Sequence, residues 1–176
     1  MFVISSEAIM PSRGVHFALT EPEVQLLLEQ TTEDDLLNLV VEQFEERYFT
    51  ESPEWLAESD KAWDAMHRIL TDGELSLDNG TYPLNHVILG GELLYGSDDY
   101  IMSLKKPQQV TDIAEALAKF SESEFRARYF EIDEEDYEAE VSEDDYEYTR
   151  SWFLNVLDLY QRAAGTGRSV LFTADQ

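Results

Sequence analysis

The chain has 176 residues, of which 43% are hydrophobic, and its 38 acidic and 12 basic side chains give a formal net charge of −26. A surplus of carboxylates this large disfavours binding to nucleic acids and anionic membranes, because these polyanions bind proteins through Lys and Arg. The absence of cysteine excludes disulfides, thiolate nucleophiles and cysteine-based metal centres.

The first dozen residues show no hydrophobic period, and we expect residues 1–12 to form a flexible N-terminal arm ahead of one domain, residues 13–176. Residues 1–4 are apolar, but Ser5 follows at once and the basic stretch of a signal peptide is missing. No window approaches the roughly 20 apolar residues of a membrane span. We therefore expect a soluble, cytoplasmic protein that binds neither membranes nor nucleic acid.

The first half of the domain is predicted to hold one strand and three helices. Residues 15–19 form a short apolar run typical of a buried strand. Thr20 and Glu23 have the spacing of a capping box, which predicts a short helix to about residue 30. Thr32 is placed to cap a second helix, and a third helix is predicted over residues 60–70. The second helix has an apolar stripe at helical spacing, formed by Leu36, Leu37, Val40, Val41, Phe44 and Tyr48.

The middle of the chain is predicted to hold two strands and two helices. Residues 86–89 and 100–104 are apolar runs that favour strands, although the first run is equally compatible with a helix. Apolar residues then recur at helical spacing up to Phe120, and Ser121 is placed to cap a shorter helix.

The last third of the chain begins with a strongly acidic segment. Residues 131–147 hold eleven acidic residues and no basic one, so mutual repulsion predicts an exposed excursion. A final helix follows, with Gly165 placed as its left-handed stop, and residues 169–173 predict a closing strand. Four short strands and five or six helices that do not strictly alternate predict an α+β fold. We expect a single compact domain with a small, mainly antiparallel sheet covered by several helices.

The predicted third helix carries the best candidate for a catalytic site. At about 100° per residue, Asp60, Asp64 and His67 fall on one narrow arc beside Trp63. A histidine flanked by two carboxylates is able to act as a general base or to hold a divalent metal. A structural interpretation explains the same residues more simply, with Asp60 as a helix cap and Asp64 in an ion pair with Arg68. We therefore assign no resident metal or cofactor.

A second group of candidates, for ligand binding, is scattered along the sequence. The group comprises His16, Trp63, Tyr82, His86, Asp98 and Asp99. His86 precedes a glycine pair, where a loop allows a ligand to approach the backbone closely. His16 lies inside an apolar strand, where a histidine is more often a hydrogen-bonded core residue. Nothing in the spacing shows that these residues meet in one pocket.

The acidic segment contains a candidate docking surface. Tyr137, Asp144, Asp145 and Tyr146 combine rigid contact area with negative charge, which suits binding to a basic protein. The alternative is a solvated loop in a protein adapted to high salt.

The leading hypothesis is a non-enzymatic interaction module for a basic protein partner, of which an antitoxin or immunity protein is one example. The alternative is a small-ligand or metal-binding enzyme that uses the Asp/His cluster beside Trp63. Standard catalytic signatures do not support the alternative, because the sequence has no nucleophile elbow, no H-E-x-x-H motif and no calcium loop.

Several stretches together resemble one family of bacterial proteins. They are residues 14–20 (GVHFALT), 60–67 (DKAWDAMH), 81–84 (TYPL), 98–101 (DDYI) and the closing strand 169–173. In these stretches the chain resembles the YfbM-like proteins, a family of unknown function. The resemblance covers most of the chain, with the exception of the first dozen residues and the acidic segment. It implies a compact α+β domain in a bacterial cytosol, and it supplies no reaction, cofactor or catalytic residue.

Overall fold

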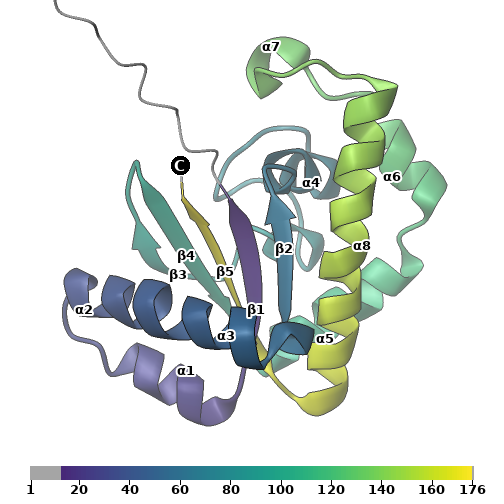
Figure 1. The fold of residues 1–176 in the computed structure, drawn as a ribbon. Helices are drawn as coiled ribbons and strands as arrows, with labels where there is room; N and C mark the ends of the chain where they lie inside the picture. The colour runs from purple at the N-terminus through teal and green to yellow at the C-terminus, as the bar shows by residue number, and fades with distance from the viewer. Residues whose placement is uncertain (1–12, 176) are drawn as a thin grey trace, which may run out of the picture.

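A five-stranded sheet forms the centre of the molecule, with helices on both faces (Figure 1). The computed structural model describes residues 13–175, so the predicted arm, residues 1–12, lies outside the described residues. The strands are β1 (Gly14–Leu19), β2 (Leu56–Asp60), β3 (Glu92–Gly96), β4 (Tyr100–Lys105) and β5 (Ser169–Asp175). Their spatial order is β2-β1-β5-β4-β3, and every neighbouring pair is antiparallel. The predicted α+β class with a small antiparallel sheet is confirmed.

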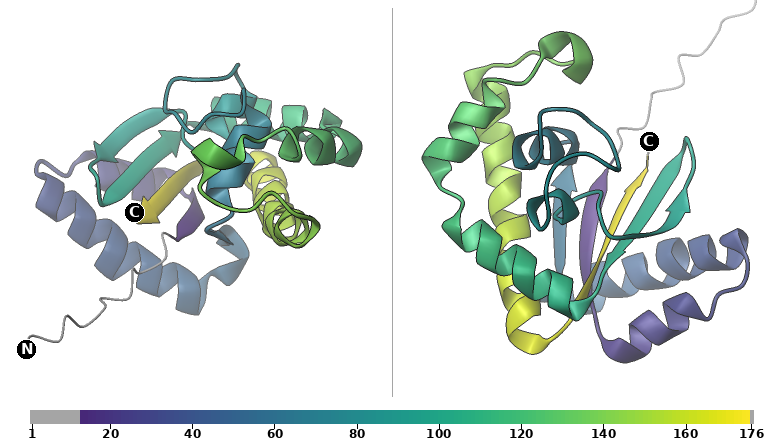
Figure 2. Two further views of the ribbon diagram at one scale, coloured as in Figure 1. Left: turned by 90° about the horizontal axis from the view of Figure 1, so that it is seen from above. Right: turned by 180° about the vertical axis from the view of Figure 1, so that it is seen from behind.

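Two helical layers enclose the sheet (Figure 2). One face is covered by α1 (Glu21–Leu28), α2 (Glu33–Asn38), the π-helix η1 (Leu39–Phe44) and α3 (Glu45–Glu51). The other face is covered by α4 (Trp63–Leu70), α5 (Pro107–Lys119), α6 (Glu122–Tyr129) and α8 (Glu143–Thr166). Three short helical segments complete the chain: η2 (Pro53–Trp55), η3 (Leu84–His86) and α7 (Glu134–Tyr137). Because both faces are covered, all six residues of β1 are buried, and the strand reads as a nearly unbroken apolar run.

The helices of the first layer begin where the caps predict. The backbone N–H of Thr20 donates to the Glu23 carboxylate at 2.8 Å, and the Thr32 hydroxyl accepts from the N–H of Asp35 at 3.1 Å. The predicted stripe is wrong at one position, because Val41 is 42% exposed while Leu39 is 4% exposed. The π-helical turns from Leu39 onward hold more residues per turn than the α-helical period assumes, which shifts the buried face.

The predicted helix over residues 60–70 is wrong in its first turn. Residues 56–60 form β2 instead, an edge strand that pairs with β1, and α4 begins only at Trp63. Asp60 ends the strand with a left-handed φ of 46°. Strand β2 was missed because it lacks the β-branched and aromatic residues that favour strands, so its conformation depends on pairing with β1.

The predicted strand over residues 86–89 is also wrong. Its first residue ends η3, and Val87, Ile88 and Leu89 lie buried against the sheet rather than within it. The second edge strand, β3, follows instead and has an irregular register between Leu93 and Tyr95. This irregularity breaks the alternation by which a strand is recognised in sequence.

The acidic segment leads directly into the last helix. Residues 131–147 form α7 and the start of α8, and most of their carboxylates are exposed, whereas Ile132 and Tyr146 are buried. The predicted stop at Gly165 is wrong, because α8 runs on to the left-handed Gly167 (φ 66°). Like every other described helix, α8 is not long and apolar enough to cross a membrane.

Candidate functional site

A buried polar cluster joins the second face of the sheet to the segment that follows η3. The Nε2–H group of His16 donates to the carbonyl oxygen of Val87 at 2.9 Å, and the Tyr160 hydroxyl donates to the same oxygen at 2.7 Å. Lys105 lies 2.6 Å (Nζ to Oγ) from Ser103, and its amine also donates to the next carbonyl along the segment. All four side chains are fully buried. They therefore anchor this segment to the sheet.

The charge state of this cluster follows from its burial. Burial lowers the pKa of Lys105 well below its ordinary value, and no carboxylate of the described residues hydrogen-bonds to its amine. Burial also lowers the pKa of His16 to about 3, with Lys105 acting in the same direction. His16 is therefore a neutral core histidine, and its Nδ1 atom has no hydrogen-bond partner among the described residues.

Replacing His16 with glutamine should make the stability less sensitive to acid. The unfolded chain takes up a proton near pH 6.5 and the folded chain only near pH 3, so His16 costs stability progressively as the pH falls through this window. The cost is about 1.4 kcal/mol per pH unit. Between pH 7 and pH 5 the parent should lose about 2 kcal/mol more than His16→Gln, measured by urea unfolding. An equal loss in both proteins would contradict the buried, neutral histidine.

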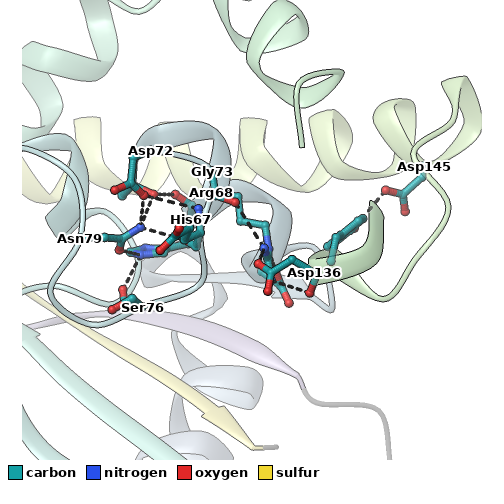
Figure 3. A network of polar contacts seen from close by, with 12 residues as sticks. His67, Arg68, Asp72, Gly73, Ser76, Asn79, Asp136 and Asp145 are labelled. Carbon is teal, nitrogen blue, oxygen red and sulfur yellow. Dashed lines mark hydrogen bonds and ion pairs between the residues drawn. The ribbon is translucent and has the colours of Figure 1, made fainter. Parts of the chain in front are cut away.

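His67 organises the loop that follows α4 (Figure 3). Its Nε2–H group donates to the carbonyl oxygen of Ser76 and to the Asn79 side-chain oxygen, both at 2.8 Å. Asn79 in turn donates to Thr71 and Asp72. The side chain of His67 is buried, which lowers its pKa. Its role in the described structure is to hold residues 71–80 in place.

Arg68 lies at the centre of a second network, shown beside the first in Figure 3. Its side chain is 3% exposed, and its Nε donates to Asp64 at 2.6 Å. The same guanidinium donates to the Asp136 carboxylate and to the carbonyl oxygens of Gly73 and Asp136. It also lies 5.7 Å from the centre of the Tyr137 ring. Arg68 therefore ties α4 to α7, which is separated from it by more than 60 residues.

Asp145 fixes α7 from the other side. Its carboxylate accepts hydrogen bonds from the hydroxyls of Tyr129 (2.6 Å) and Tyr137 (3.0 Å). Burial, followed by the charge of Asp145, raises the pKa of Tyr137, so this tyrosine remains a donor. Arg68 and Asp145 together hold the short helix, and with it the acidic segment, against the body of the protein.

The acidic segment and the loop after α4 enclose a cleft of about 550 Å³. Five carboxylates line it: Asp72, Glu74, Glu131, Asp133 and Asp136. Leu75, which is 37% exposed, adds an apolar surface to the lining. A smaller cleft of about 230 Å³ adjoins it, shares Asp72 and Glu131, and reaches Arg68 and Arg128. This acidic cleft has the size and charge to accept a cationic side chain.

The structure takes Asp60 off the predicted helix, whereas Asp64 and His67 both stay on α4. Asp60 lies outside α4 and accepts a hydrogen bond from the Tyr148 hydroxyl at 2.6 Å. Asp64 is paired with Arg68, and burial raises the pKa of this carboxyl although Arg68 acts in the opposite direction. Trp63 is buried against Phe172, with 5.8 Å between ring centres. The narrow arc that the helical period predicted is therefore not formed.

The other predicted ligand-binding residues lie in different parts of the fold. Tyr82 packs edge-on against His86 and donates a hydrogen bond to Asp112. Asp98 and Asp99 are exposed in the turn between β3 and β4. Among the described residues, no group of three or more histidine and carboxylate side chains is placed to hold a metal ion.

The predicted docking residues are largely used inside the protein. Asp144 is exposed, but Tyr146 is 2% exposed and lies under the guanidinium of Arg126 at 4.7 Å. Tyr137 and Asp145 bind each other, as described above. The cleft is instead lined by Asp133 and Asp136 of the same segment. The burial of Tyr146 was predictable from the sequence. Tyr146 lies two helical turns before Phe153, so it belongs to the same apolar stripe of α8.

Comparisons with known proteins give a family and a fold, and no function. A family model described as a domain of unknown function, DUF1877, matches residues 10–173. The fold is similar to the crystal structure of YfbM from Escherichia coli, a protein of unknown function. The two share 19% sequence identity over 92% of this chain and 99% of that chain, with a TM-score of 0.64. No match was found among curated proteins. At this identity the likeness shows the fold alone, and the YfbM-like resemblance predicted from sequence is confirmed.

Proposed function

The chain belongs to the DUF1877 family, whose function is unknown, and from its own residues we propose that it is a non-enzymatic binding module for a basic protein partner. The observation that supports this proposal is the acidic cleft, in which five carboxylates from two distant segments face one space. The nearby guanidinium of Arg68 is buried and already paired with Asp64 and Asp136. The cleft therefore keeps an excess of negative charge for a cation from outside.

The lining of the cleft suits the side chains of lysine and arginine. Each has a cationic head, which the carboxylates of Glu74, Glu131 and Asp133 are placed to bind, and an aliphatic stem, which Leu75 is placed to contact. The net charge of −26 adds long-range attraction for a cationic protein, which raises the association rate at low ionic strength. Among residues 13–175 no contact favours the enzymatic alternative, because Asp64 and His67 are both held in structural contacts.

The proposal is tested by removing charge from the cleft. The variant Glu74→Gln, Glu131→Gln, Asp133→Asn removes three charges, and asparagine preserves the cap of α7 because its side-chain oxygen also accepts a hydrogen bond. The control variant Glu42→Gln, Glu46→Gln, Glu51→Gln removes the same charge from η1 and α3, where these side chains are exposed.

Each immobilised protein is exposed to extract of the native host at about 0.05 M salt and washed at about 0.5 M salt. The parent and the control should capture the same basic protein and release it at high salt, and the cleft variant should fail to capture it. Equal capture by the cleft variant would contradict the proposal, as would the absence of any basic protein from the parent.

A further inference from the structure

Strand β2 forms one edge of the sheet. One side of β2 pairs with β1, and no described strand pairs with its other side. In an antiparallel pair, alternate residues direct their N–H and C=O groups away from the partner strand. The outer side of β2 therefore presents backbone donors and acceptors to which another extended chain is able to bind.

A groove of about 220 Å³ lies beside the first three residues of this edge, between β2 and α8. In Figures 1 and 2, α8 runs beside β2 along its length. Leu56, Ala57 and Glu58 of β2 line one wall, and Trp152, Asn155, Asp158 and Arg162 line the other. The residues from α8 recur at a spacing of three or four, so they form one face of the helix, which is turned toward the groove. An edge strand and a parallel wall of side chains are the two parts of a groove that binds an extended peptide.

The helix wall offers unused polar groups. The side chains of Asn155 and Asp158 are exposed and make no hydrogen bond or ion pair with another described residue. Arg162, by contrast, donates to the carbonyl oxygen of Glu54 at 3.1 Å and closes one end of the groove. Glu58 is paired with Arg13. The free carboxylate in the groove is therefore that of Asp158, with Trp152 beside it as a partly buried aromatic surface.

We infer that this groove holds an extended, cationic segment of the basic partner, which adds to β2 as a further strand. The inference rests on the proposed function and specifies how part of the same partner is bound. Charge selects this occupant: Asp158 is the carboxylate of the groove that is not in an ion pair, Arg162 is held at one end by the carbonyl oxygen of Glu54, and a second copy of the chain would bring a further net charge of −26. The length of β2 matches a segment of about five residues.

A synthetic hexapeptide of alternating lysine and valine, blocked at both ends, is the probe. Its control is the same peptide with every peptide nitrogen methylated, which keeps the charge and removes the backbone donors. At saturating probe, the outward-facing amides of residues 56–60 should exchange hydrogen at least about fivefold more slowly, and the methylated peptide should bind at least about tenfold more weakly.

Side-chain recognition is tested with Asp158→Lys, which should weaken binding of the probe at least about fivefold at an ionic strength of about 0.15 M. Glu42→Lys makes the same charge change on the opposite side of the sheet, and its effect should be clearly smaller. Equal binding of both peptides, unchanged exchange in β2, or equal effects of the two variants would each overturn the groove as the binding site.

The experiments on the groove and on the cleft distinguish the failure of one proposal from the failure of the other. If the host protein is captured normally by the cleft variant while the probe still protects β2, the proposed role of the cleft fails and the groove remains supported. If capture depends on the cleft but β2 is never protected, the groove proposal fails and the proposed function stands.

Discussion

Replacing Arg68 with alanine should lower the free energy of unfolding by about 3 kcal/mol. The substitution leaves Asp64, whose side chain is 26% exposed, without the cation that balances its burial. It also removes the hydrogen bonds that tie α7 to α4, so the amides of residues 134–137 should exchange hydrogen faster. Urea unfolding gives the first quantity and hydrogen exchange the second.

A double variant separates the buried charge from the packing of the side chain. In Arg68→Met, Asp64→Leu both charged groups are replaced by apolar ones of similar size, so much of the lost stability should return. A loss of less than about 1 kcal/mol in Arg68→Ala would contradict the buried pair, because that is the range of exposed ion pairs.

Replacing Phe172 with alanine should have a still larger effect, a loss of about 4 kcal/mol in the free energy of unfolding. Phe172 is fully buried in β5, the central strand, and its ring centre lies 4.8 Å from that of His16 and 5.4 Å from the amine of Lys105. Alanine leaves a cavity at the point where the sheet, α4 and the buried polar cluster meet.

The matched control for this cavity is Phe172→Leu, which keeps most of the side-chain volume and should cost less than about 1.5 kcal/mol. Urea unfolding monitored by circular dichroism measures both variants, and the slope of the transition should be unchanged. Equal losses in the two variants would show that Phe172 does not fill the centre of the core.

The elements that sequence predicted best are those fixed by local interactions. Thr32 and Ser121 accept hydrogen bonds from the N–H groups of Asp35 and Glu124, as a cap requires, and these helices begin where expected. The two edge strands were missed for different local reasons, since β2 has weak strand propensity and the irregular register of β3 breaks the alternation. Each has one partner strand in the sheet. Their conformation is decided by residues far away in the chain.

The candidate site was also hard to predict, because it depends on residues that lie far apart in the chain. Its carboxylates come from the loop after α4 and from residues 131–136, which are brought together by Arg68 and Tyr137. Sequence reasoning assigned Arg68 to an ordinary helical ion pair with Asp64, which is present, but the bond to Asp136 has no local signal. Lys105 was missed because a lysine at the end of a strand is usually exposed.

The acidic segment stands out in the sequence for its charge, although the residues chosen within it as a docking surface are not those that line the cleft. Asp145 and Tyr146 alternate with exposed acids in the sequence, yet the first turns of α8 place them against the body of the protein. The composition of the segment shows its excess of charge, whereas the position of each residue around the helix decides which carboxylates face solvent.

The affinity of the captured partner for the parent and for the cleft variant, measured across a range of salt concentrations, tests most directly whether the acidic cleft binds a basic protein. The variant Glu74→Gln, Glu131→Gln, Asp133→Asn should bind at least about tenfold more weakly at low salt, and its affinity should fall less steeply as salt rises. Identical affinities and identical salt dependence in the two proteins would contradict the claim.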